Sequence, residues 1–322
     1  MVSILLILIS IFWAMNMGGS GYSVSFAPSV GAGIIKKEKA VFLFTLFVLL
    51  GSLFAGINVV KTLSSKIVPS EFLKEEVVLI ILFSSSISLF IANILKIPQS
   101  TSMVTIGSFI GAGIYFNALN FRFLPKIFLT WIFVSFISYY FTYLLWKKIY
   151  PPSFGNLKIY EKIFLNKNKL EKWVLLSDYY RAFGIGTNNV ANVVGPLFAA
   201  KIILPYEGFL IFSLIFGIGG YIFGRKIIGT VSNEIIPLGI ASSSIISLVV
   251  SSLIILCSVF GIPAPYVQFS TFSILAIHTL KEGKKHIDSL NHSITRKIIK
   301  VWIITPFLSG FLTYILLSLL KK

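Results

Sequence analysis

The chain has 322 residues, of which 56% are hydrophobic and only 12% are charged, with 28 Lys and Arg against 11 Asp and Glu. This composition, with a mean hydropathy of +0.90, excludes an ordinary soluble domain and indicates a polytopic membrane protein. The single cysteine, Cys257, excludes a disulfide framework within one chain and a cysteine-based metal site.

Ten apolar segments follow one another along the chain, and a helix needs about 20 apolar residues to cross a bilayer core of about 30 Å. Six segments supply that length without a strong interruption: 40–60, 76–95, 125–146, 207–224, 235–260 and 299–320. Four segments are interrupted by Gly, Pro, Ser, Thr or Asn: 2–35, 98–119, 173–200 and 263–280. We interpret 2–35 as a retained span, because no Lys or Arg precedes its apolar run.

The positive charges are distributed unevenly over the loops between these ten segments. The odd-numbered loops contain 19 Lys and Arg residues, whereas the even-numbered loops and the C-terminus contain 8. The positive-inside rule therefore predicts a multi-pass protein of the cell membrane with the odd loops in the cytoplasm and both termini external. A nucleic-acid partner is not expected, because no aromatic residues interleave with these charges.

The two halves of the chain resemble each other. WIFVSFISYYFTYLL at 131–145 and WIITPFLSGFLTYIL at 302–316 agree at seven of fifteen positions, and IPQSTSMVT at 97–105 lies opposite IPAPYVQFS at 262–270. We therefore predict a first repeat at 1–148, a cytoplasmic linker at 149–172 and a second repeat at 173–322. Five membrane segments per repeat make the second repeat enter from the opposite side. The predicted fold is an all-α polytopic membrane protein with two inverted-topology repeats and broken helices or half-helices at the midplane.

The interrupted segments contain motifs that resemble those of the inorganic phosphate transporter (PiT) family. GTNNVANVVGP at 186–196 is similar to the family signature G-A-N-D-V-A-N-A-x-G-P. IPQSTSMV resembles the family motif P-x-S-T-T-H at Pro98, Ser100 and Thr101. The resemblance implies import of inorganic phosphate, or of sulfate as in one bacterial branch, usually with Na⁺ or H⁺, by a homodimer in the lipid bilayer.

The chain also departs from the family pattern. The signature aspartate is replaced by Asn189 in the second repeat and by Gly21 in the first, where Ser20 replaces the asparagine. Because those aspartates are implicated in cation coupling, the coupling ion is left open between H⁺ and Na⁺. No cofactor and no metal site are expected.

The predicted substrate-binding residues are polar side chains of the interrupted segments. Asparagine offers N–H to an oxyanion and C=O to a cation, and hydroxyls at a helix start after Pro98 suit an anion. For each residue the alternative is a hydrogen bond that only joins neighbouring helices. The residues are Ser20, Ser100, Thr101, Ser102, Asn188, Asn189, Asn192, Gln268, Ser270 and Thr271.

Asp178 and Arg181 form a predicted charged pair inside a membrane segment, spaced i, i+3 on one helix face. We expect Arg181 to compensate the charge of the anion, with Asp178 holding Arg181 when the site is empty and H⁺ acting as the driving ion. The alternative is a snorkelling pair at the membrane interface.

The favoured function is a secondary active transporter that imports inorganic phosphate by alternating access with ion coupling. A sulfate permease of the same family and a passive anion channel are the alternatives. An intramembrane enzyme is not expected, because the spans contain neither a Ser-His-Asp set nor a His and Asp cluster.

Overall fold

A computed structural model describes residues 2–94, 99–164, 166–234, 239–282 and 293–320 of the chain. Within these residues the fold is all-helical, and seven helices are long and apolar enough to cross a membrane. The all-α polytopic fold is therefore confirmed. The α-helices are α1 (Val2–Gly31), α2 (Lys37–Gly51), α3 (Ile57–Lys61), α4 (Glu75–Ile94), α5 (Thr101–Tyr115), α6 (Leu124–Lys147), α7 (Leu157–Phe164), α8 (Lys167–Asn189), α9 (Ala191–Ala199), α10 (Pro205–Glu234), α11 (Ile240–Val259), α12 (Tyr266–Glu282) and α14 (Ser293–Leu320).

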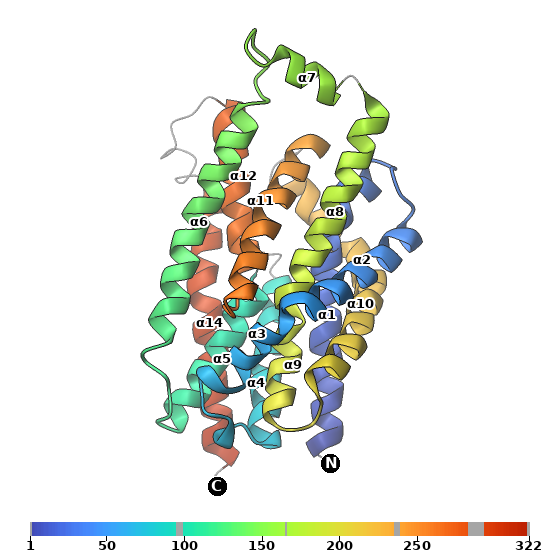
Figure 1. Cartoon of the computed structure of the whole chain (residues 1–322). Helices are drawn as coiled ribbons and strands as arrows, with labels where there is room; N and C mark the ends of the chain where they lie inside the picture. Colours follow the sequence, from blue (N-terminus) through green and yellow to red (C-terminus); the bar gives the residue numbers. More distant parts are fainter. Residues whose placement is uncertain (1, 95–98, 165, 235–238, 283–292, 321–322) are drawn as a thin grey trace.

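The helices form an elongated bundle (Figure 1). Both chain termini lie at one end of the bundle, and α7 lies across the opposite end, between the tops of α6 and α8. The α6–α8 connection, which contains the predicted cytoplasmic linker, is therefore remote from the two termini.

Two of the four interrupted segments form helices without the expected break. Residues 2–31 form one continuous helix, and 167–199 is interrupted only at Val190, whose φ of −62° and ψ of −32° are those of a right-handed helix. The glycines of α1 serve close packing instead: a Cβ on Gly18 would lie 2.2 Å from the carbonyl oxygen of Phe216 in α10. The segment expected as a plain span at 40–60 is the irregular one, because π-helical turns at Ser52–Gly56 and Thr62–Lys66 separate α2 from α3 and end α3.

The described parts of the other two interrupted segments give helices that are too short to cross a bilayer. α5 has 15 residues and α12 has 17, which correspond to about 22 and 25 Å at 1.5 Å per residue. The side chain of Ser100 caps α5 by accepting a hydrogen bond from the Met103 amide at 3.5 Å. Non-helical residues 262–265 precede α12. Both short helices therefore begin inside the bundle, as the interrupted motifs predicted.

The crossings of α1 with α10 and of α8 with α2 are equivalent to each other. At each crossing a glycine lies so close to a carbonyl oxygen that a Cβ would come within 2.0–2.2 Å of it. The four glycine and carbonyl pairs are Gly18 with Phe216, Gly186 with Val48, Gly51 with Phe183 and Gly219 with Met15. Each pair has one residue in each half of the chain. Adding 168 to the number of the residue in the first half and subtracting 168 from that of the residue in the second half gives another of the four pairs.

A second set of matched contacts joins each short helix to the last helix of the other half. Ser309 of α14 donates a hydrogen bond to the Val104 carbonyl of α5 at 3.0 Å, and Ser138 of α6 donates to the Phe269 carbonyl of α12 at 2.9 Å. Each of these serines also contacts a serine of the short helix, Ser108 and Ser273 respectively. These contacts place the starts of α5 and α12 at corresponding positions.

Candidate functional site

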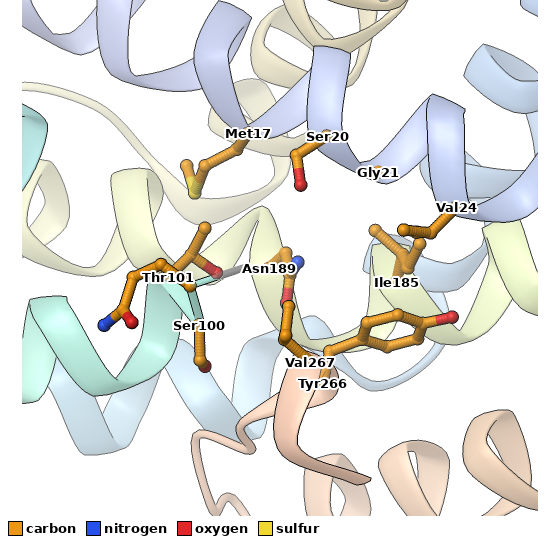
Figure 2. A pocket seen from close by; sticks show the side chains of 11 residues that line it. Met17, Ser20, Gly21, Val24, Ser100, Thr101, Ile185, Asn189, Tyr266 and Val267 are labelled. Atoms are coloured by element: carbon orange, nitrogen blue, oxygen red, sulfur yellow. The ribbon is translucent and has the colours of Figure 1, made fainter. Parts of the chain in front are cut away.

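A small cavity lies where α1, α8 and the starts of α5 and α12 meet (Figure 2). Its volume is about 20 Å³, which is close to the space that one water molecule requires. The residues that line it are Met17, Ser20, Gly21, Val24, Gln99, Ser100, Thr101, Ile185, Asn189, Tyr266 and Val267. Of the predicted substrate-binding residues, Ser20, Ser100, Thr101 and Asn189 therefore meet at one cavity.

Two amide side chains of this cavity have unused hydrogen-bonding atoms. Asn189 is the last residue of α8 and is 7% exposed, and its Oδ1 has no hydrogen-bond partner. Gln99 is 4% exposed, and no described residue forms a hydrogen bond with its Oε1 or Nε2. A buried polar atom without a partner costs about 1–3 kcal/mol, so these amides are available to a polar ligand.

Hydroxyl groups face these amides from two elements. The Ser20 hydroxyl points from α1 toward Asn189 in Figure 2, and Thr101 lies beside Asn189 at the first residue of α5. The first turn of α5 also leaves backbone N–H groups without a helical partner, and such N–H groups attract anions. The cavity thus combines hydroxyl, amide and backbone donors, which are the groups that bind an oxyanion.

Asn188 and Asn192 do not line the cavity but hold its walls together. Asn188 Oδ1 accepts from the Ala264 amide at 2.9 Å, and its Nδ2 donates to the Ser258 hydroxyl at 2.9 Å and to the Ile262 carbonyl at 3.1 Å. Asn192 Nδ2 lies 3.3 Å from the hydroxyls of both Thr101 and Ser102. The geometry therefore favours the alternative interpretation of these two asparagines and of Ser102, in which they fix the two short helices.

The predicted residues of α12 lie outside the cavity. Thr271 donates to the Val267 carbonyl of its own helix at 2.8 Å, Gln268 Oε1 is buried without a partner, and Ser270 accepts from Arg181 at 3.4 Å. The start of α12 instead contributes Tyr266 and Val267 to the lining. The aligned motifs contained this signal for Tyr266, because Tyr266 occupies the place of the lining residue Thr101.

Asp178 and Arg181 are both buried, at 1% and 6% exposure, but the expected ion pair between them is not formed. The ion pair that α8 does form joins Lys167 and Glu171 at the surface, at 3.9 Å. No described residue donates a well-formed hydrogen bond to either carboxylate oxygen of Asp178, although the hydroxyl and amide of Ser29 in α1 lie close enough to stabilise its charged form. Burial of both side chains also argues against a snorkelling pair.

Hydroxyl groups hold the Arg181 guanidinium instead. Nε donates to the Tyr266 hydroxyl, and Nη1 and Nη2 donate to Ser247 and Ser270, each at 3.4 Å. The guanidinium carbon lies 5.3 Å from the centroid of the Tyr266 ring. Arg181 therefore approaches the cavity only through Tyr266, which is itself a lining residue.

The sequence profile of the Phosphate transporter family matches residues 17–175 and 166–313 of the chain. The chain is 36% identical over 321 residues to the sulfate permease CysP of Bacillus subtilis, in a match that covers 98% of this chain and 87% of that protein. It is 24% identical to a putative phosphate permease of Methanocaldococcus jannaschii over 96% of this chain and 95% of that protein. The fold matches the solved structure of a sodium-dependent phosphate transporter with a TM-score of 0.85, at 18% identity and 99% coverage of both chains.

Proposed function

The chain belongs to the phosphate transporter family, and from this membership we propose that it is a secondary active transporter that moves a small inorganic oxyanion by alternating access. The family makes it an anion transporter and a multi-pass membrane protein rather than an enzyme. The observation that carries the proposal is the buried cavity in which Ser20, Gln99, Thr101 and Asn189 meet beside the start of α5.

Sulfate is the proposed substrate, in preference to the phosphate that the motifs favoured. At neutral pH phosphate retains a proton and can donate a hydrogen bond, whereas sulfate only accepts. The residues that line the described cavity include no carboxylate, so only neutral acceptors such as Asn189 Oδ1 and Gln99 Oε1 could bind the phosphate proton, and they reward it less than a charged acceptor would. The full-length similarity to a sulfate permease points the same way.

Alternating access between two inverted repeats, 1–148 and 173–322, is the proposed mechanism. The glycine contacts that repeat at 168 residues support the duplication. A cavity of about 20 Å³ is smaller than a tetrahedral oxyanion needs, so the helices around it must separate to admit the substrate. We keep the predicted orientation, with the linker cytoplasmic and both termini external, and the homodimer stays a prediction.

H⁺ is the proposed coupling ion, and Asp178 is its proposed carrier. The carboxylate is 1% exposed and forms no ion pair with a described residue; the hydroxyl and amide of Ser29 in α1 lie beside it, and Arg181 lies one turn further along α8. An ionised carboxylate without an ion-pair partner is costly in such surroundings, so taking up a proton there would offset the charge of an incoming anion. The alternative is Na⁺, on which the structurally similar phosphate transporter depends.

Uptake of labelled sulfate into proteoliposomes, competed with unlabelled sulfate or phosphate, tests the substrate. We expect saturable uptake that sulfate inhibits at lower concentration than phosphate. Stronger inhibition by phosphate would return the assignment to phosphate. Preloading the vesicles with unlabelled sulfate should produce counterflow, and its absence would favour a passive channel over a carrier.

A further inference from the structure

We propose that Arg181, with Ser247 and Ser270, forms a second anion station next to the cavity, and that the Tyr266 side chain is the gate between the two. The proposal rests on the proposed oxyanion transport. It assigns to these residues a role in the movement of the anion rather than in its first binding.

The partners of Arg181 are the first reason. Among the described residues, its three hydrogen-bond acceptors are neutral hydroxyls, and the two serine contacts at 3.4 Å lie beyond the usual range of 2.7–3.2 Å for an N–H···O bond. Asp178, one turn earlier on α8, attracts Arg181 without forming an ion pair with it. A buried charge is stable only when it is paired or well hydrogen-bonded, and an oxyanion would bind a guanidinium with shorter, charge-assisted bonds. An anion can therefore readily displace these hydroxyls from the Arg181 guanidinium.

The position of Arg181 along α8 is the second reason. Arg181, Ile185 and Asn189 are spaced i, i+4 and i+8, so they follow one face of the helix over about 12 Å. Ile185 and Asn189 line the cavity, whereas Arg181 does not. The station thus lies on the side of the cavity that faces the start of α8 and the linker, in line with the path of an anion toward that end of the bundle.

Tyr266 contacts both the cavity and the Arg181 guanidinium. Its ring lines the cavity, and its hydroxyl, which points away from Ser100 and Thr101 in Figure 2, accepts the hydrogen bond from Arg181 Nε. An anion that leaves the cavity toward the linker must therefore replace the Tyr266 hydroxyl at the guanidinium. Swinging of the ring would then transfer the anion from the amides to Arg181.

Two measurements on purified protein separate binding from movement: equilibrium binding of labelled sulfate in detergent, and sulfate exchange in proteoliposomes. For Arg181→Gln we expect binding close to that of the wild type, because the cavity is intact. Exchange should be slower by about tenfold or more, the loss expected when bonds to a charged group are removed. Arg181→Lys, which keeps the charge, should recover part of the exchange. For Tyr266→Phe we expect faster exchange, because the anion no longer competes with the hydroxyl.

Tyr180→Phe is the matched control, because it removes a tyrosine–serine hydrogen bond of 3.0 Å to Ser252 from the same helix without touching Arg181. It should leave exchange unchanged. Loss of binding itself in Arg181→Gln would place Arg181 in the first site and overturn the second station. Equal exchange in wild type, Arg181→Gln and Tyr266→Phe would overturn it as well. A wild-type protein that binds neither sulfate nor phosphate would instead contradict the proposed function, and the station with it.

Discussion

Asn188 and Asn189 are adjacent, yet they are expected to respond differently to substitution. Asn189→Ala removes a cavity-lining amide whose N–H₂ group can donate to sulfate, so we expect weaker sulfate binding by about 5- to 150-fold, the equivalent of 1–3 kcal/mol, with little change in melting temperature. Asn188→Ala removes bonds to Ser258, Ile262 and Ala264, so it should chiefly lower the melting temperature. Both variants should be tested by thermal unfolding and by sulfate binding. A lower melting temperature in Asn189→Ala together with weaker binding in Asn188→Ala would contradict this assignment.

Thr101 and Thr105 provide a second comparison on one helix. Thr101 lines the cavity, whereas the Thr105 hydroxyl is buried and donates to the Thr101 carbonyl at 2.9 Å. We expect Thr101→Ala to weaken sulfate binding by about 5-fold or more, because it removes a ligand-facing hydroxyl, and Thr101→Ser to retain most of it. Thr105→Ala should bind as the wild type does. Equal binding by all three variants would show that the Thr101 hydroxyl serves only Asn192.

The sequence predicted Thr101, Asn188 and Asn189 as site residues but left the direction of each side chain open. Neighbouring residues of a helix point about 100° apart, so of two adjacent asparagines only one faces a given cavity. Which one does so depends on the serines of α11 and the residues before α12, far away in the chain. Gln99 was missed for the same reason: its position before Ser100 was visible, whereas its lack of a partner is a property of the fold.

At the scale of the helices, the glycine crossings should be the most sensitive points of the fold. A Cβ on Gly186 would lie 2.1 Å from the Val48 carbonyl oxygen, and backbone cannot move aside as a side chain can. We expect Gly186→Ala to destabilise the protein by about 1–3 kcal/mol or more. Gly31→Ala is the control, because no atom lies within 4 Å of its added Cβ. Equal melting temperatures for the two variants would contradict the close crossing.

Hydrophobic length predicted the places of the seven long apolar helices of the described residues, but not where the helices are interrupted. Gly18, Gly19 and Gly21 are compatible with a helix break and also with close packing of another helix. The contact of Gly18 with the Phe216 carbonyl shows that close packing is what the structure uses. The π-helical turn at Ser52–Gly56 had no such signal. It lies where Gly51 meets the backbone of Phe183, a contact between two halves of the chain.

For the whole molecule, the sequence indicated two related halves, because matched motifs of the two halves are separated by nearly the same number of residues. It leaves open how unequal the two halves are at the site: α5 contributes hydroxyls to the cavity, and α12 contributes an aromatic ring and an aliphatic side chain.

The predicted orientation is testable with single cysteines, since the native Cys257 is buried at 4% exposure. Phe154 precedes α7 and is fully exposed, and Phe121 lies between α5 and α6 at 74% exposure. We expect an impermeant thiol reagent added outside intact cells to label Phe121→Cys but not Phe154→Cys, because positive charge near the linker holds it in the cytoplasm. Labelling of both positions from outside would contradict the orientation and the five segments per repeat.

The driving ion is the last property of the whole molecule that the structure makes testable. If a proton taken up at Asp178 accompanies the anion, transport should rise as the external pH falls, because a higher proton concentration favours the loaded carrier, and replacing Na⁺ with K⁺ should change nothing. Asp178→Asn fixes the side chain in a neutral form, so it should flatten the pH profile of uptake while leaving sulfate affinity nearly intact. Glu171→Gln is the control, because this carboxylate lies on the same helix at the surface, 3.9 Å from Lys167, and it should keep the wild-type profile. A strict requirement for Na⁺, or an unchanged pH profile in Asp178→Asn, would exclude proton coupling at Asp178 while leaving the oxyanion cavity in place.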